Sequence, residues 1–175
     1  GLAYLSLAEY PEAEANFQKS IEIDANRPEA YVDLGAVYQR TGDSENFLRI
    51  LSLGVENNPE NAELVSGTGM GFLSLGLNDQ ALEYFIRALE LELNFPPALM
   101  GVGSIMLGRG EQENAISMLE LVPENSSVEF PDGLLLAQAY AFVDKNESLI
   151  ILEELRAKYG RDEQIDPVID YVNEL

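Results

Sequence analysis

Two stretches decide the fold of this chain: YVDLGAVY at residues 31–38 and ALEYFIRALEL at residues 81–91. Gly35 of the first stretch recurs as Gly69 and Gly103, so the sequence repeats itself every 34 residues. A large side chain follows each of these glycines by three positions, at Tyr38, Phe72 and Met106. This spacing is helical and predicts one helix at the start of each repeat.

The second stretch predicts another helix in each repeat. A small residue, a large apolar one four positions later and a further residue three positions on recur as Ala13, Phe17, Ser20; Ala81, Phe85, Ala88; and Ala115, Leu119, Val122. Glycines that can close a helix follow the first helices, and prolines separate successive pairs. The glycines are Gly42, Gly76 and Gly110, and the prolines are Pro28, Pro59 and Pro96 or Pro97. The pattern predicts αα-hairpins.

With these residues the chain resembles the tetratricopeptide repeat (TPR) family. Leu34, Gly35 and Tyr38 match its first-helix signature, and Ala81, Phe85 and Ala88 match its second. The resemblance implies an all-α solenoid of αα-hairpins, wound as a right-handed superhelix and closed by a C-terminal capping helix. The implied divisions are TPR repeats over 1–161 (a truncated first repeat at 1–27, then 28–61, 62–95, 96–129 and a degenerate 130–161) and a capping helix at 162–175.

Some repeats depart from the pattern. In the second repeat, Phe47 and Gly54 stand where small residues with a side chain are usual, so we expect altered packing there. In the fifth, deleting one residue places Ser148, Leu152 and Leu155 in register. Within the capping segment 162–175, the helix itself is expected to begin with Asp166 as its N-cap and Pro167 as its first residue. Gly1 matches the eighth position of a repeat, which suggests an excerpt of a longer protein.

Composition narrows the function. The chain has no Cys and no His, which removes the common zinc sites and the nucleophile pairs that use these residues. Acidic residues outnumber basic ones 31 to 10, giving a formal charge of −21, so nucleic acid and anionic membranes are repelled. We predict no enzyme, no catalytic residue, no metal and no cofactor. No targeting signal is recognisable; the compartment stays open, with the cytoplasm favoured.

Two motifs that suggest chemistry are better explained by structure. Gly67-Thr68-Gly69-Met70-Gly71 resembles a nucleotide loop, but it follows no strand and has no lysine nearby, so close helix packing is expected. Paired carboxylates are expected on exposed surface, whereas acid/base or metal chemistry would need them to be buried and close together. They are Glu111 and Glu113, Glu153 and Glu154, and Asp162 and Glu163.

The family resemblance also implies a binding surface on the concave wall built by the first helices. The positions that face a ligand in this family are mostly small or apolar here, and the expected partner is a protein or peptide with apolar anchors, with basic flanks favoured by the acidic charge. The predicted groove residues are Leu5, Val32, Ala36, Gln39, Ser66, Met70, Leu73, Met100, Ser104, Leu107, Leu134 and Gln138.

Alternatives stay open. The same residues could be core, covered by the next hairpin. The repeats could instead serve self-association or docking onto the rest of a longer chain, or form a substrate-presenting, non-catalytic domain of a larger enzyme. The sequence favours an interaction scaffold, or adaptor, and leaves its partner unnamed. Replacing Met70 and Leu73 together with Glu separates groove from core, because only core residues would be needed for folding.

Overall fold

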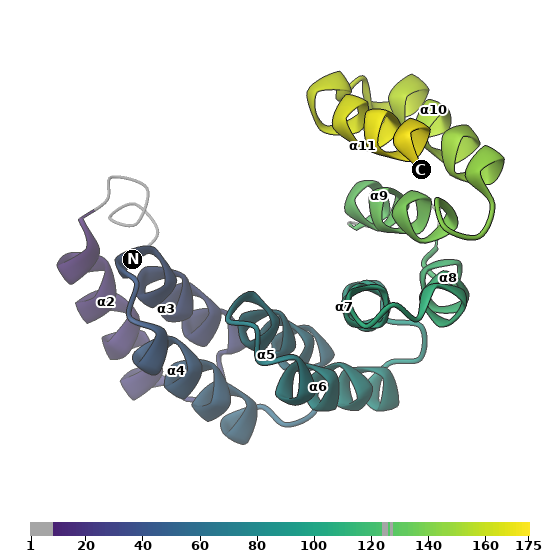
Figure 1. Cartoon of the computed structure of the whole chain (residues 1–175). Helices are drawn as coiled ribbons and strands as arrows, with labels where there is room; N and C mark the ends of the chain where they lie inside the picture. Colours follow the sequence, from purple (N-terminus) through teal and green to yellow (C-terminus); the bar gives the residue numbers. More distant parts are fainter. Residues whose placement is uncertain (1–8, 124–125, 127) are drawn as a thin grey trace. The chain divides into compact units, whose positions relative to one another are not determined.

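A computed structural model of the chain describes residues 9–123, 126 and 128–175, and this part contains ten α-helices and no strand (Figure 1). The helices of the first half are α2 (Tyr10–Ile23), α3 (Pro28–Thr41), α4 (Ser44–Asn57), α5 (Ala62–Ser74) and α6 (Asn78–Leu91). Those of the second half are α7 (Pro96–Gly108), α8 (Gln112–Leu119), α9 (Glu129–Tyr140), α10 (Lys145–Tyr159) and α11 (Asp162–Glu174). The predicted all-α hairpin fold is confirmed.

The contacts divide the chain into two compact units, Gly1–Glu92 and Leu93–Leu175, called unit 1 and unit 2 below. Within unit 1, α3 packs on α4 and α5 on α6; within unit 2, α7 packs on α8 and α9 on α10. In each unit, sequence-adjacent helices therefore form hairpins, as short connections require.

The hairpin turns use the glycines that the repeat picks out. Gly42, Gly76 and Gly110 have φ values of 75°, 74° and 76°, a left-handed conformation that is strained for other residues. Caps define the following helices as well: the Asp43 side chain accepts a hydrogen bond from the Asn46 amide at 3.1 Å, and Asn61 does the same for Leu64 at 2.7 Å. These local signals mark the ends of α3, α5 and α7 and the starts of α4 and α5.

Close approach of the paired helices explains the repeating glycine. A Cβ atom at Gly69 would lie 2.9 Å from the Phe85 ring, and one at Gly103 would lie 2.5 Å from Leu119. Each contact joins a glycine to the apolar residue sixteen positions later. The two sequence signatures are therefore the two sides of one contact, which buries Phe85 and Leu119 almost completely.

The altered second repeat is accommodated by its neighbours. The Tyr31 side chain lies 2.8 Å from where a Gly54 Cβ would be, so the missing side chain makes room for a buried tyrosine. Phe47 lies 3.0 Å from where a Gly71 Cβ would be. The bulk of Phe47 is thus matched by a glycine in the following helix, and this glycine belongs to the segment that resembles a nucleotide loop. That segment lies inside α5.

In the last two helices, the structure agrees with the register predicted for α10 and corrects the predicted start of α11. Ser148, Leu152 and Leu155 are all buried in α10, in the register obtained by deleting one residue. The expected start of the last helix at Asp166 is wrong, because α11 begins at Asp162 and holds Pro167 in its interior. The earlier start places Ile165 and Val172, two helical turns apart, on one completely buried face.

Candidate partner-binding surfaces

The predicted groove residues of unit 1 lie on α3 and α5 and differ in exposure. Val32 and Met70 are exposed, with 44% and 36% of their surface accessible, and Gln39 is exposed too. Ala36 and Leu73 are half-buried, whereas Ser66 is completely buried and is therefore not available to a partner. Leu5 lies outside the described residues.

A cavity of about 200 Å³ adjoins this surface between the beginnings of α3 and α5. Val32 and Leu64 give it apolar walls, and Glu29, Asp33 and Glu63 add three carboxylates. Burial raises the pKa of Asp33, and the neighbouring Glu29 adds to the effect. An apolar floor with an acidic edge suits an apolar anchor that carries a positive charge beside it.

The predicted groove residues of unit 2 are all half-buried, on α7 and α9: Met100, Ser104, Leu107, Leu134 and Gln138. Leu134 packs against the core that α9 shares with α10 and α11, and Leu107 packs against the core around Ala115. These two side chains therefore contribute to folding as well as to the surface.

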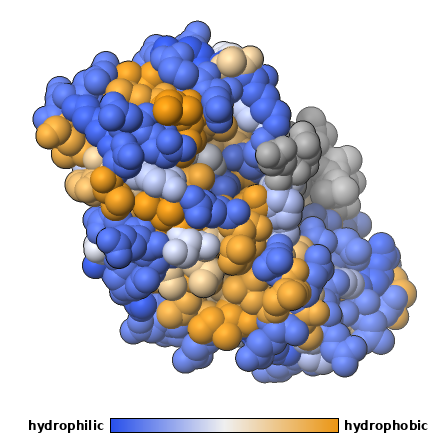
Figure 2. Space-filling model, turned by 90° about the vertical axis from the view of Figure 1, so that its right-hand side faces the viewer, coloured by the Kyte–Doolittle hydropathy of each residue, from blue (hydrophilic) through white to orange (hydrophobic). Residues whose placement is uncertain are grey.

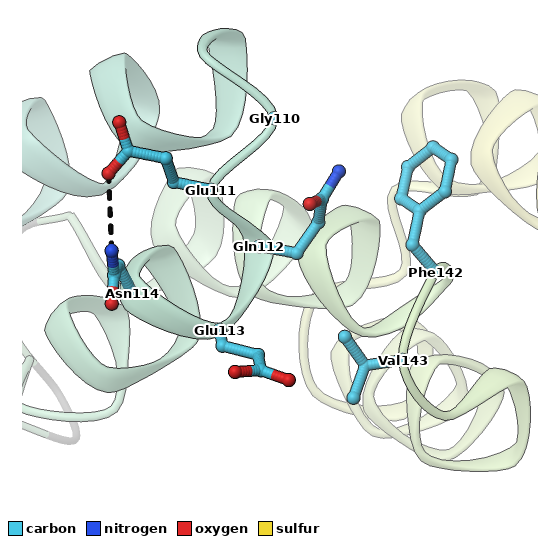
Figure 3. A pocket seen from close by; sticks show the side chains of 7 residues that line it. All are labelled: Gly110, Glu111, Gln112, Glu113, Asn114, Phe142 and Val143. Atoms are coloured by element: carbon cyan, nitrogen blue, oxygen red, sulfur yellow. Dashed lines mark hydrogen bonds between the residues drawn. The ribbon is translucent and has the colours of Figure 1, made fainter.

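Two of these groove residues, Leu107 and Gln138, line a cavity of about 430 Å³ together with Phe142 and Tyr171. The two aromatic rings meet edge to face, with centroids 6.3 Å apart, and 54% of Phe142 remains accessible. A second cavity, of about 390 Å³, shares Gln112 and Phe142 with the first; in Figure 3 these two side chains lie on either side of it. Phe142 is an exposed aromatic that two cavities share.

The surface is otherwise rich in charge, and Figure 2 shows apolar patches among hydrophilic ones on the face it presents. The adjacent carboxylates at 111 and 113, 153 and 154, and 162 and 163 are exposed. Among the residues that the structure describes, no group of three or more Asp or Glu side chains is arranged to hold a metal ion. No described helix has the length and apolar character needed to cross a membrane.

One buried acid was missed by the sequence analysis. Asp132, in the first turns of α9, is only 6% exposed, and burial raises the pKa of its carboxyl to about 7. A signal was present in the repeat: residues 30, 64, 98 and 132 are spaced by 34, and the first three are the buried Ala30, Leu64 and Ala98. A carboxyl at a core position of the 34-residue period is therefore the sequence signal for this buried acid.

Comparisons with known proteins agree with the helix pairs. The family model described as "TPR repeat" matches residues 1–42. BBSome complex member BBS4 from Bos taurus is 27% identical over 123 residues, which are 70% of this chain and 23% of that protein. The chain thus spans less than a quarter of the length of this relative.

Solved structures share the fold. TTC0263, a thermophilic TPR protein of Thermus thermophilus, superposes with a TM-score of 0.74 at 17% identity, over 100% of this chain and 96% of that one. YrrB, a TPR protein described as having an unusual peptide-binding site, gives a TM-score of 0.69 at 21% identity, over 99% and 88% of the two chains. The repeat period, the observed hairpins and these likenesses together show that the chain has the tetratricopeptide-repeat fold, and the family model places a TPR repeat at residues 1–42.

Proposed function

We propose that the chain is a protein-interaction module that binds an apolar or amphipathic segment of a partner along the first helices of its hairpins. The observation that carries this proposal is in unit 1. Val32 and Met70 are exposed apolar side chains on α3 and α5, and Val32 lines a cavity that has three carboxylates. Exposed apolar residues beside a shaped cavity supply the anchor sites that peptide recognition needs.

The charge of the chain supports basic residues in the partner beside the apolar anchors. With 31 acidic and 10 basic residues, the chain attracts cationic segments over several ångströms and repels acidic ones. The likeness to YrrB supports peptide binding as the mode, and the likeness to a BBSome complex member supports a role within an assembly. Both remain properties of those proteins.

The test uses a synthetic peptide that has leucine anchors at helical spacing and lysines at both ends, followed by fluorescence anisotropy. Val32→Glu with Met70→Glu should weaken binding at least tenfold, because two charges replace the apolar anchor sites. The matched control changes Leu53 and Ile86, which are exposed apolar residues on α4 and α6, to Glu. The control should bind as the unchanged chain does.

Two further outcomes decide the proposal. A peptide with glutamates in place of the lysines should bind much more weakly, and the difference should shrink at high salt. If both double variants weaken binding equally, or the Val32 and Met70 variant loses its helical circular dichroism, the first-helix surface of unit 1 is not the binding site. The pair Met70→Glu and Leu73→Glu is the stricter test of folding, since Leu73 is half-buried.

A further inference from the structure

Unit 2 contains a cavity of about 350 Å³ whose lining includes none of the predicted groove residues. It is bounded by α9, by α10 and by Val122 and Pro123. Three side chains, Leu136, Ile151 and Leu155, give it apolar walls. Its volume is at the low end for ligand pockets, which suits one long side chain better than a larger molecule.

Asp132 lines this cavity and has an acceptor atom that the described chain does not use. Its side chain is 6% exposed, and Oδ1 is buried with no hydrogen-bond partner. A buried carboxylate without a donor is costly, and native structures rarely keep one without a reason. An apolar residue at this position would avoid the cost, as Ala30, Leu64 and Ala98 do in the earlier repeats.

The charges around the cavity favour a cation. Lys158 lines the same space, but its ammonium pairs with Glu129, and this hydrogen bond raises the pKa of Lys158. Glu154 also faces the cavity. When Asp132 is ionised, the cavity therefore carries three carboxylates and one ammonium, so a further positive charge is attracted.

We propose that this cavity binds a lysine side chain of a partner, with its ammonium on the Asp132 carboxylate and its methylene stem against Leu136, Ile151 and Leu155. The apolar walls favour this ligand over a metal ion, because a metal ion prefers several oxygen ligands around it. A lysine stem buries well along apolar surface while its head finds a charged acceptor. The cavity is lined by none of the predicted groove residues, and its proposed ligand does not depend on the function proposed above.

Binding of an ammonium at this site is coupled to the protonation of the Asp132 carboxyl. The groups that face Asp132 across the cavity are Glu129 on its own helix and Glu154 and Lys158 on α10. Burial raises the pKa of Asp132 to about 7, and an ammonium binds its ionised form. Binding should therefore release a proton, and should be about tenfold tighter at pH 8 than at pH 6, the factor by which the ionised fraction grows.

The test follows the side-chain carboxyl carbon of Asp132 by NMR in the full ¹³C-labelled chain. The probes are n-butylammonium chloride, Nα-acetyl-lysine N-methylamide and, as neutral controls, 1-butanol and the Nζ-acetylated form of the lysine compound. We expect both cations to shift the Asp132 resonance saturably and to lower its titration midpoint, whereas the neutral compounds leave it unchanged.

Matched variants complete the experiment. Binding of the cations, followed through the methyl resonances of Leu136 and Leu155, should be lost in Asp132→Asn and kept in Asp170→Asn, which removes an exposed acid of the same unit. If neither cation affects Asp132, or if Asp132→Asn binds as tightly as the unchanged chain, the proposal fails. If n-butylammonium binds and the lysine compound does not, the assignment to a lysine side chain is overturned.

Discussion

The α5–α6 hairpin of unit 1 and the α9–α10 hairpin of unit 2 build the same fold with different contacts. In α5–α6, Gly69 is the point of close approach, and a Cβ there would lie 2.9 Å from Phe85. In α9–α10 the equivalent residue is Ala137, and close approach moves one turn earlier to Gly133, where a Cβ would lie 2.9 Å from Leu155. A glycine therefore allows close approach in both hairpins, although its position differs by one helical turn.

The shifted hairpin replaces apolar contacts by polar ones. Ser148 occupies the place of Ala81 and donates a hydrogen bond to the Ala137 carbonyl at 2.7 Å. Asp132 occupies the place of an apolar residue and has no donor at Oδ1. The turn also changes, because Asp144 caps α10 through the amides of Asn146 and Glu147 where α5–α6 uses a left-handed glycine. Repeat geometry therefore tolerates polar groups at core positions: a backbone carbonyl satisfies Ser148, and the ligand proposed above would satisfy Asp132.

The largest expected effect comes from filling the close contact in α5–α6. Gly69→Val should destabilise the chain by about 3 kcal/mol, because the added atoms meet the completely buried Phe85 ring and the Ala81 backbone oxygen, 3.2 Å from the Cβ position. Urea unfolding followed by circular dichroism measures the change. Gly67→Val is the matched control, since a Cβ at Gly67 meets nothing within 4 Å, and should change stability by less than about 0.5 kcal/mol. Equal losses in both variants would show that helix propensity, and not packing, is responsible.

Much of this fold could be predicted from the sequence because the repeat imposes local signals. The glycine turns at Gly42, Gly76 and Gly110 follow directly from residue type and spacing. Exposure could not be predicted in the same way. Val32 and Ser66 occupy the same repeat position, yet Val32 is 44% exposed and Ser66 is completely buried. Burial at a given position depends on what packs against each helix, which spacing alone does not determine.

The start of α11 shows a similar limit of local rules. Asp166 and Pro167 form a typical helix start, and the chain instead keeps Pro167 inside the helix. Arg156 of α10 pairs with Asp162, at 3.1 Å, and with Asp166, so both acids lie against the preceding helix. Burial of Ile165 adds tertiary stabilisation that a helix starting at Asp166 would lose.

An effect of intermediate size is expected from Asp132 in the core of the α9–α10 hairpin, where stability should depend on pH. The pKa of Asp132 is about 7 in the folded chain and about 4 when unfolded, so its contribution to stability is complete below pH 4 and is lost as pH rises to 7. The side chain of Asp132→Asn does not titrate. The free energy of unfolding of this variant, relative to that of the unchanged chain, should therefore rise by about 2 kcal/mol from about pH 5.5 to pH 8. Urea unfolding at both pH values measures this difference. Asp170→Asn should show no such trend, and a flat difference for Asp132→Asn would contradict the raised pKa.

The smallest effect concerns Ser148, whose hydroxyl substitutes for the apolar contact of the regular hairpin. The Ala137 carbonyl also accepts the amide of Ala141 at 3.0 Å, so removing the hydroxyl leaves no acceptor unsatisfied. Ser148→Ala should therefore cost only about 0.5–1 kcal/mol in urea unfolding, less than the loss of a sole partner would. Ser117→Ala removes an exposed hydroxyl that donates to the Glu113 carbonyl at 2.9 Å, and should cost nothing measurable. If Ser148→Ala instead stabilises the chain, the alanine of the regular repeat packs better even in the shifted register, and the hydroxyl is not what holds α10 against α9.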